Sequence, residues 1–152
     1  MSKLPNDPLL NISINSFAEK LRKGEIICEE IVTSYLNRIK ALNDKLNAFI
    51  FIDEKKAINN AIAIDKLLKS GVDLGPLMGL PVAIKDICSV NNMPTTNGSI
   101  VNSDDITGEE GSLVKRLKEL GCVVIGKTHT VEFALGATCL LYTSDAADDR
   151  IC

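Results

Sequence analysis

Residues 113–125 read LVKRLKELGCVVI and join a helical pattern to a strand pattern. Apolar positions in the first part recur at intervals of three and four, which predicts a helix, and Gly121 is placed to end it. Cys122 to Ile125 form a short apolar run that is typical of a buried strand. A similar run, Val82 to Ile84, precedes the helix in the chain. The order strand, helix, strand predicts a βαβ unit in a sheet whose two faces are covered.

Three amphipathic helices are expected before this unit. Ser13 can cap the first, which Gly24 should end, and residues 27–42 show the clearest helical spacing of apolar positions. Asp53 should cap the third helix, which should run to Ser70. Between the second and third, residues 47–52 are apolar and favour a strand. The sequence therefore predicts an α/β fold, with N-terminal helices followed by part of a mixed or parallel sheet covered by helices.

Composition and charge narrow the classes of function. The length of 152 residues, with 45% hydrophobic and 24% charged residues, is typical of one globular domain. The 17 Lys and Arg are spread among 20 Asp and Glu, so direct nucleic-acid binding is not expected. Neither a secretory leader nor an apolar run of about 18 residues is present. We expect a cytoplasmic protein that does not enter membranes.

The cysteine pattern predicts no metal centre and no disulfide framework. An odd number of cysteines is present, and no two have the spacing of a zinc or redox pair. They are Cys28, Cys88, Cys122, Cys139 and Cys152. We interpret them as small thiols of a reduced compartment.

Lys85 is the candidate catalytic residue. It directly follows the apolar run 82–84, so its amine should lie at the end of a buried strand, beside Asp86. A free lysine has a pKa of about 10.4, and a lysine that acts as a neutral base near pH 7 needs a shift of roughly three units from burial and neighbours. By position alone, the alternative is a solvated strand-end lysine, loosely paired with Asp86.

Four segments together resemble the amidase signature family. They are GPLMGLPVAIKD (residues 75–86), MPTTNGS (93–99), GCVVIGKT (121–128) and EFALG (132–136). The resemblance implies hydrolysis of an amide by a serine, a second serine preceded by a cis peptide bond, and a lysine that Lys85 matches. Such a lysine takes a proton from the bridging serine, which activates the nucleophilic serine, and no metal or organic cofactor is implied.

The same resemblance implies a downstream Gly-Ser-Ser-Gly-Gly-Ser segment that supplies the bridging serine and oxyanion-binding N–H groups. This chain contains no such segment, and its pairs Gly98-Ser99 and Gly111-Ser112 stand in other contexts. We therefore assign Lys85 the base role, assign no nucleophile, and expect the printed chain to be inactive.

From Cys139 onward the sequence departs from the family pattern. Residues 139–149 read CLLYTSDAADD and resemble the translation of a transposase adaptor used to prepare DNA sequencing libraries. We therefore expect residues 1–138 to be the N-terminal portion of an amidase signature domain and residues 139–152 to be a non-native tail. Such a piece of a domain should be marginally stable or prone to aggregation.

Two rival functions remain. The A subunit of a glutamyl-tRNA amidotransferase has the same fold and triad but passes ammonia to a partner subunit; the string at residues 93–99 looks more like the stand-alone hydrolases. A non-catalytic α/β binding module is the rival from another class, although residues 75–79 lack the Gly-x-Gly-x-x-Gly turn of a dinucleotide site. The expected partner is a small-molecule amide. The sequence does not identify this amide or the oligomeric state of the protein.

Other polar residues of these segments are assigned structural roles. The hydroxyls of Thr95, Thr96 and Ser99 could line a pocket, but in such a loop they more often stabilise turns. His129 is the sole histidine, and without a matched serine or cysteine we expect a surface or packing role.

Overall fold

The computed structural model describes residues 5–102, 106 and 108–135. Within these residues the elements are α1 (Ile14–Arg22), α2 (Cys28–Leu46), β1 (Phe49–Ile52), α3 (Glu54–Lys69), β2 (Pro81–Lys85), η1 (Ile100–Asn102), α4 (Ser112–Glu119), β3 (Val123–Thr128) and η2 (Glu132–Ala134), where η denotes a 3-10 turn. The predicted α/β class is confirmed. The predicted boundary after residue 138 and the tail at 139–152 lie outside the described residues.

The three strands form one mixed sheet in the order β1-β3-β2. The middle strand, β3, is parallel to β2 and antiparallel to β1. Since α4 connects β2 to β3, the predicted βαβ unit is confirmed. The parallel register places Ile84 opposite Lys127 and Lys85 opposite Thr128, so both strands end at the same edge of the sheet.

Helix ends follow the capping chemistry expected from the sequence. Ser13 Oγ accepts a hydrogen bond from the Ser16 N–H at 3.1 Å, and Asp53 Oδ1 accepts one from the Lys56 N–H at 3.0 Å. These bonds satisfy N–H groups that a helix leaves without intrahelical partners. The third helix ends at Lys69, one residue before the predicted end at Ser70.

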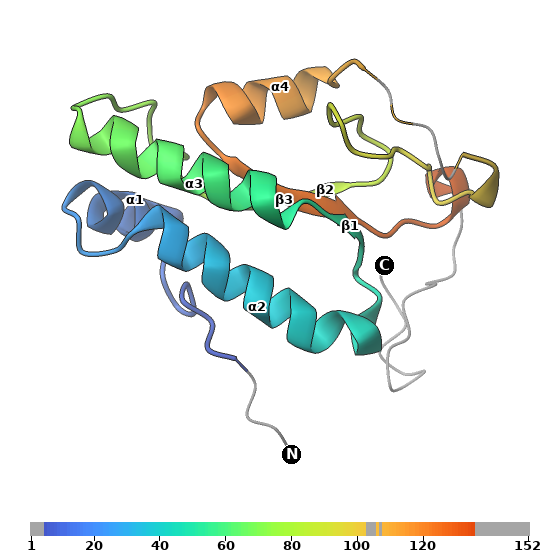
Figure 1. Cartoon of the computed structure of the whole chain (residues 1–152), viewed down its shortest axis with the longest axis horizontal. Coiled ribbons are helices and arrows are strands. Elements are labelled where there is room, and N and C mark those ends of the chain that lie inside the picture. Colours follow the sequence, from blue (N-terminus) through green and yellow to red (C-terminus); the bar gives the residue numbers. More distant parts are fainter. Residues whose placement is uncertain (1–4, 103–105, 107, 136–152) are drawn as a thin grey trace.

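Each face of the sheet has its own apolar core. The α1–α3 side is a cluster that includes Phe17, Leu36 and the β3 residues Val123 and Ile125. On the other side, Val124 of β3 packs with a smaller cluster around α4. Its buried members are Ile84, Val90, Met93, Val114 and Val124. Figure 1 shows α2 and α3 side by side, with α4 across the strands from α2.

Side chains at the end of β2 are alternately buried and exposed. Ile84 is 4% exposed and belongs to the α4-side cluster, whereas Ala83 and Lys85 are exposed. Successive side chains of a strand point to opposite faces. Lys85 therefore projects from the face opposite α4, where the described helices cover β3 rather than the end of β2.

The thiols behave as small apolar groups. Cys28 and Cys122 are buried, Cys88 is partly buried, and all three are free. Burial raises the pKa of the Cys28 thiol to about 12. Cys139 and Cys152 lie outside the described residues.

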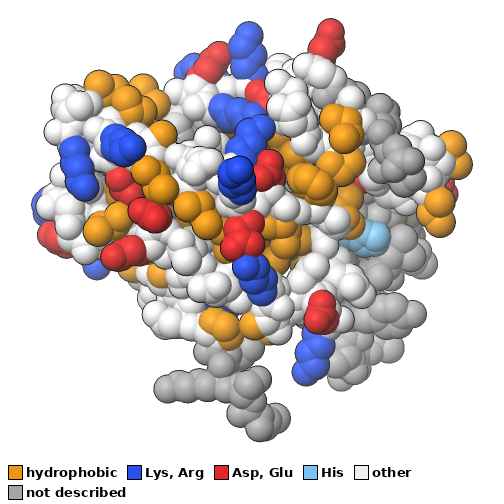
Figure 2. All heavy atoms as spheres, in the orientation of Figure 1, with side chains coloured by type: hydrophobic (Ala, Val, Ile, Leu, Met, Phe, Trp, Pro, Cys, Tyr) orange, Lys and Arg blue, Asp and Glu red, His pale blue; other side chains and the backbone are white. Residues whose placement is uncertain are grey.

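None of the helices in residues 5–102, 106 and 108–135 is long and apolar enough to cross a membrane. Figure 2 shows acidic and basic side chains interspersed over the visible face, with hydrophobic side chains gathered between them.

Candidate active site

Lys85, the predicted base, is the last residue of β2 and its side chain is exposed. Its backbone is fixed on both sides: the Lys85 carbonyl accepts a hydrogen bond from the Cys88 N–H at 3.0 Å, and the Asp86 N–H donates to the Thr128 carbonyl at 3.0 Å. Within the described residues, no ion pair or side-chain hydrogen bond involves the Lys85 amine. The strand-end position is confirmed, but the suggested pairing of Lys85 with Asp86 is wrong.

Asp86 instead pairs with Lys127, which lies in β3. Both side chains are fully buried, and Lys127 Nζ lies 3.1 Å from Asp86 Oδ1. The same nitrogen donates to the Pro94 carbonyl at 3.0 Å and to Thr95 Oγ1 at 2.9 Å. An ammonium group has three N–H donors, so these three acceptors satisfy it. Removing one member of such a pair costs about 3–5 kcal/mol, because the other charge is left buried without its partner.

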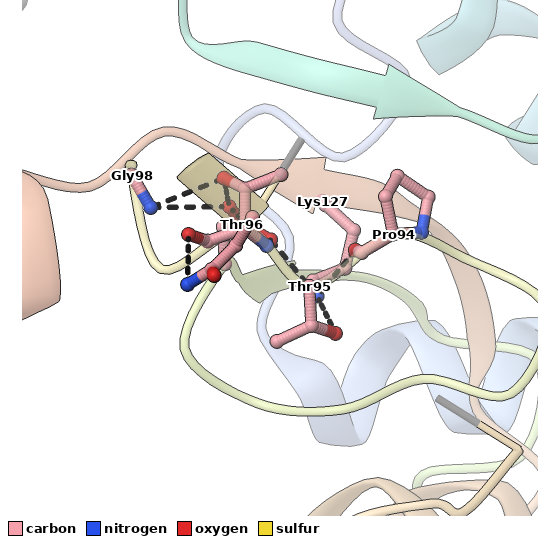
Figure 3. A network of polar contacts seen from close by, with 7 residues as sticks. Pro94, Thr95, Thr96, Gly98 and Lys127 are labelled. Carbon is pink, nitrogen blue, oxygen red and sulfur yellow. Dashed lines mark hydrogen bonds and ion pairs between the residues drawn. The ribbon is translucent and has the colours of Figure 1, made fainter. Parts of the chain in front are cut away.

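Asp86 also binds the loop of residues 94–98. Its carboxylate accepts hydrogen bonds from the Thr96 N–H at 3.2 Å, from the Thr96 hydroxyl, and from the Gly98 N–H at 3.4 Å. Its main-chain carbonyl accepts a hydrogen bond from the Asn97 N–H at 3.0 Å. In Figure 3, Lys127 extends toward Pro94 and Thr95, while Thr96 and Gly98 form the other part of the network. The loop is thus held to the ends of both parallel strands.

A second layer of contacts ties this loop to residues 130–133. Ser99 Oγ donates to Glu132 Oε1 at 2.7 Å, and the Phe133 N–H donates to the Asn97 carbonyl at 2.7 Å. Gly98 has φ +71°, and a Cβ there would lie 2.7 Å from the Thr130 carbonyl oxygen. This close approach requires glycine, since any side chain would push the two segments apart.

The hydroxyl residues have the structural roles expected for them. Thr95 and Ser99 are each 5% exposed, and each hydroxyl is bonded to a charged side chain. His129 is partly buried, and its backbone N–H donates to the Ala48 carbonyl at 2.9 Å. The part of the chain that the structure describes contains no cluster of His, Cys, Asp and Glu that could hold a metal ion.

Sequence reasoning did not identify Lys127 as part of this site. Its side chain is completely buried. Two features of the sequence could have pointed to Lys127. It lies two residues after the apolar run 122–125, and its strand was predicted to be parallel to the strand that ends in Lys85. What the sequence lacked was the path of the loop 94–98, which returns to cover it.

The site therefore consists of a fixed network of buried polar groups and, next to it, the amine of Lys85, which has no partner among the described side chains. Asp86, Lys127 and the loop 94–98 form a buried, hydrogen-bonded network, and Lys85 is covalently joined to it through Asp86. A deprotonated amine in this position can accept a proton from a hydroxyl within hydrogen-bond reach. Nothing in this network supplies an activated nucleophile, since the hydroxyls of Thr95, Thr96 and Ser99 are bonded to charged groups within it.

Comparison with known proteins gives consistent matches. Residues 30–145 match the family described as Amidase. The A subunit of the glutamyl-tRNA(Gln) amidotransferase from Rhodopirellula baltica is 39% identical over 126 residues, which are 83% of this chain and 25% of that protein. Its counterpart from Streptomyces coelicolor is 35% identical over 130 residues, 86% of this chain and 26% of that protein.

Among solved structures, the native peptide amidase of Stenotrophomonas maltophilia superimposes with a TM-score of 0.79 at 29% sequence identity. The match covers 84% of this chain and 26% of that one. The chain thus spans about a quarter of the length of the relatives it matches.

Proposed function

The chain belongs to the amidase family, and from this premise we propose that it forms part of an enzyme that hydrolyses a small-molecule carboxylic acid amide, with Lys85 as the base. In the proposed reaction the neutral Lys85 amine takes a proton from a bridging serine, and that serine takes one from a nucleophilic serine. The nucleophile attacks the amide carbonyl, ammonia leaves, and water hydrolyses the acyl-serine to the acid.

The observation that supports Lys85 is the contrast between the two lysines at this edge of the sheet. Lys127 donates to three acceptors and is fully buried, so its nitrogen has no position free for a serine hydroxyl. Lys85 is exposed, and none of the described side chains pairs with it. An amine that is free of other partners and fixed at its backbone is available to a serine hydroxyl, and in this proposal the rest of the amidase domain covers the amine.

The proposal places both serines outside this chain, in sequence that corresponds to the Gly-Ser-Ser-Gly-Gly-Ser segment. It also treats residues 1–138 as the N-terminal portion of the amidase domain and residues 139–152 as non-native. The printed chain should then hydrolyse no amide, and hydrolysis by the purified chain would contradict this assignment. The reaction needs no metal or organic cofactor.

A chimaera tests the proposed function directly. Residues 1–138 are fused to the remainder of the Stenotrophomonas maltophilia peptide amidase, and ammonia release from a panel of amides is measured. We expect turnover by the chimaera and loss of turnover on Lys85→Met, with Lys69→Met on α3 as a control that leaves activity unchanged. A folded chimaera in which Lys85→Met keeps full activity would overturn the role of Lys85.

The A subunit of a glutamyl-tRNA amidotransferase is the second candidate, because relatives at 35% and 39% identity bear that name. A chimaera with the remainder of the Rhodopirellula baltica protein tests it. If the candidate is correct, this chimaera copurifies with the partner subunits and supplies them with ammonia from glutamine. Hydrolysis without partners favours the stand-alone amidase, and folded but inactive chimaeras of both kinds favour a binding module. In each of the three cases we place the protein in the cytoplasm.

A further inference from the structure

We propose that Asp86 and Lys127 are positioning residues, whose buried ion pair fixes the backbone that presents the Lys85 amine. The inference rests on the proposed function, because it assigns these residues a task in the reaction that Lys85 catalyses. It extends that function to two side chains that are fully buried. It also explains why a charged pair is buried at this place in the fold.

The Asp86–Lys127 pair lies at the ends of two neighbouring strands. Asp86 directly follows Lys85, and Lys127 lies opposite Ile84 in the neighbouring parallel strand. The pair therefore joins the ends of β2 and β3 at the point where β2 gives way to a loop. A side-chain contact of 3.1 Å across this junction adds to the main-chain bond from the Asp86 N–H to the Thr128 carbonyl. Together they hold the residue after Lys85 by both its backbone and its side chain.

Each charged group of this network has hydrogen-bond partners. Lys127 uses its three donors on Asp86, the Pro94 carbonyl and Thr95, and Asp86 accepts from Lys127, Thr96 and Gly98. A buried polar network with every member bonded specifies one geometry, because each alternative leaves a polar group without a partner. The loop 94–98 thus has one arrangement over the strand ends, and Figure 3 shows its contacts converging there.

A buried ion pair is weak evidence for stability, because apolar residues of similar volume in its place are often neutral or stabilising. We therefore assign the Asp86–Lys127 pair the role of fixing one geometry. The neighbouring α4-side cluster, with Ile84 and Val124, shows that this side of the sheet can be packed with apolar groups alone. The pair lies beside the one strand-end amine that the described part of the structure leaves uncommitted.

The test uses the active chimaera, in which Lys127→Met and Asp86→Asn are each made. Misplacement of a catalytic group by about 1 Å costs about 10²-fold in rate, so we expect kcat to fall by about that factor. KM should change by less than about threefold, since both side chains are fully buried. The acidic limb of the kcat profile against pH should also move, because it reports the ionisation of the base in the complex.

A control of matched stability separates positioning from simple destabilisation. Leu36→Ala on α2 removes a side chain that is 1% exposed and packs in the α1–α3 cluster, which contains none of residues 94–98. It should lower the urea midpoint comparably and leave kcat and the pH profile unchanged. If Lys127→Met does no more than Leu36→Ala, the inference is wrong. If Lys127→Met does not fold, the double variant D86N/K127M, which buries no lone charge, replaces it and should still lose kcat; parental kcat would overturn the inference.

The two proposals fail differently. Full activity of Lys85→Met would remove the proposed function, whatever the other variants do. Loss of activity in Lys85→Met, together with parental kcat and pH profile in Lys127→Met and Asp86→Asn, would leave the function standing and remove only the positioning role.

Discussion

Replacing Gly126 by alanine tests whether close contact between β1 and β3 fixes the sheet. Gly126 lies in the middle strand, opposite Ile52 on one side and Ala83 on the other. A Cβ at this position would lie 2.2 Å from the Phe51 carbonyl oxygen, and both neighbouring contacts within 3.2 Å are also backbone atoms. No side-chain rotation can relieve such a clash, so the strands themselves must move apart.

The size of the effect follows from the distances. Ordinary contact begins at 3.4 Å, so β1 must move by about 1.2 Å relative to β3. A shift of that size strains the hydrogen bonds that flank the contact, from the Asp53 N–H to the Ile125 carbonyl at 3.2 Å and from the His129 N–H to the Ala48 carbonyl at 2.9 Å. Overpacking costs typically 1–3 kcal/mol and a lost hydrogen bond about 1 kcal/mol, so we expect a loss of about 3 kcal/mol.

Urea unfolding followed by circular dichroism measures this loss. With a slope of about 2 kcal/mol/M, the midpoint of the Gly126→Ala variant should fall by about 1.5 M. Gly108→Ala is the matched control, because a Cβ at Gly108 meets nothing within 4 Å, and its midpoint should stay within about 0.3 M of the parent. Equal midpoints for the two variants would refute the reasoning that Gly126 is required by backbone contact.

Three further predictions concern thiols, a helix cap and the surface. Because burial raises the pKa of Cys28 to about 12, its thiol stays protonated at pH 8, and peptide-resolved mass spectrometry should find Cys88 alkylated well before Cys28; equal rates would contradict the burial. Asp53→Ala removes the cap of α3 and should cost about 1 kcal/mol in urea unfolding, whereas Asp53→Asn should keep most of it. Ile100 and Val101 are 92% and 90% exposed, so changing both to serine should reduce light scattering on warming without lowering the urea midpoint; unchanged scattering would show that aggregation begins elsewhere.

Local signals in the sequence were sufficient for the elements and the fold class. The caps at Ser13 and Asp53 and the apolar run 82–84 depend on neighbours within a few residues, and each is found where expected. The order of the strands needed one further rule, that a helical crossover joins parallel strands. The antiparallel placement of β1 beside β3 could not be derived in this way, because no short connection links the two strands.

The sequence identified Lys85 but not Lys127, because local signals do not show contacts between distant segments. Lys85 could be assigned from the strand end and the family resemblance, both of which are local in the sequence. The burial of Lys127 depends on acceptors more than thirty residues earlier, the Pro94 carbonyl and Thr95, and on the carboxylate of Asp86. The alternative considered for Lys85 paired it loosely with Asp86, whereas the fold pairs Asp86 with Lys127 of the neighbouring strand.

Register also explains why the two lysines cannot exchange roles. Lys127 lies opposite Ile84, whose side chain packs toward α4, and so it points to the face that the loop 94–98 covers. Lys85 is one residue further along and lies opposite Thr128, so it projects from the other face. Since strand side chains alternate with a period of two, a slip of one residue between β2 and β3 would reverse the two environments. The exposure of Lys85 and the burial of Lys127 therefore depend on the register between β2 and β3, which shifts between Val82 and Ala83.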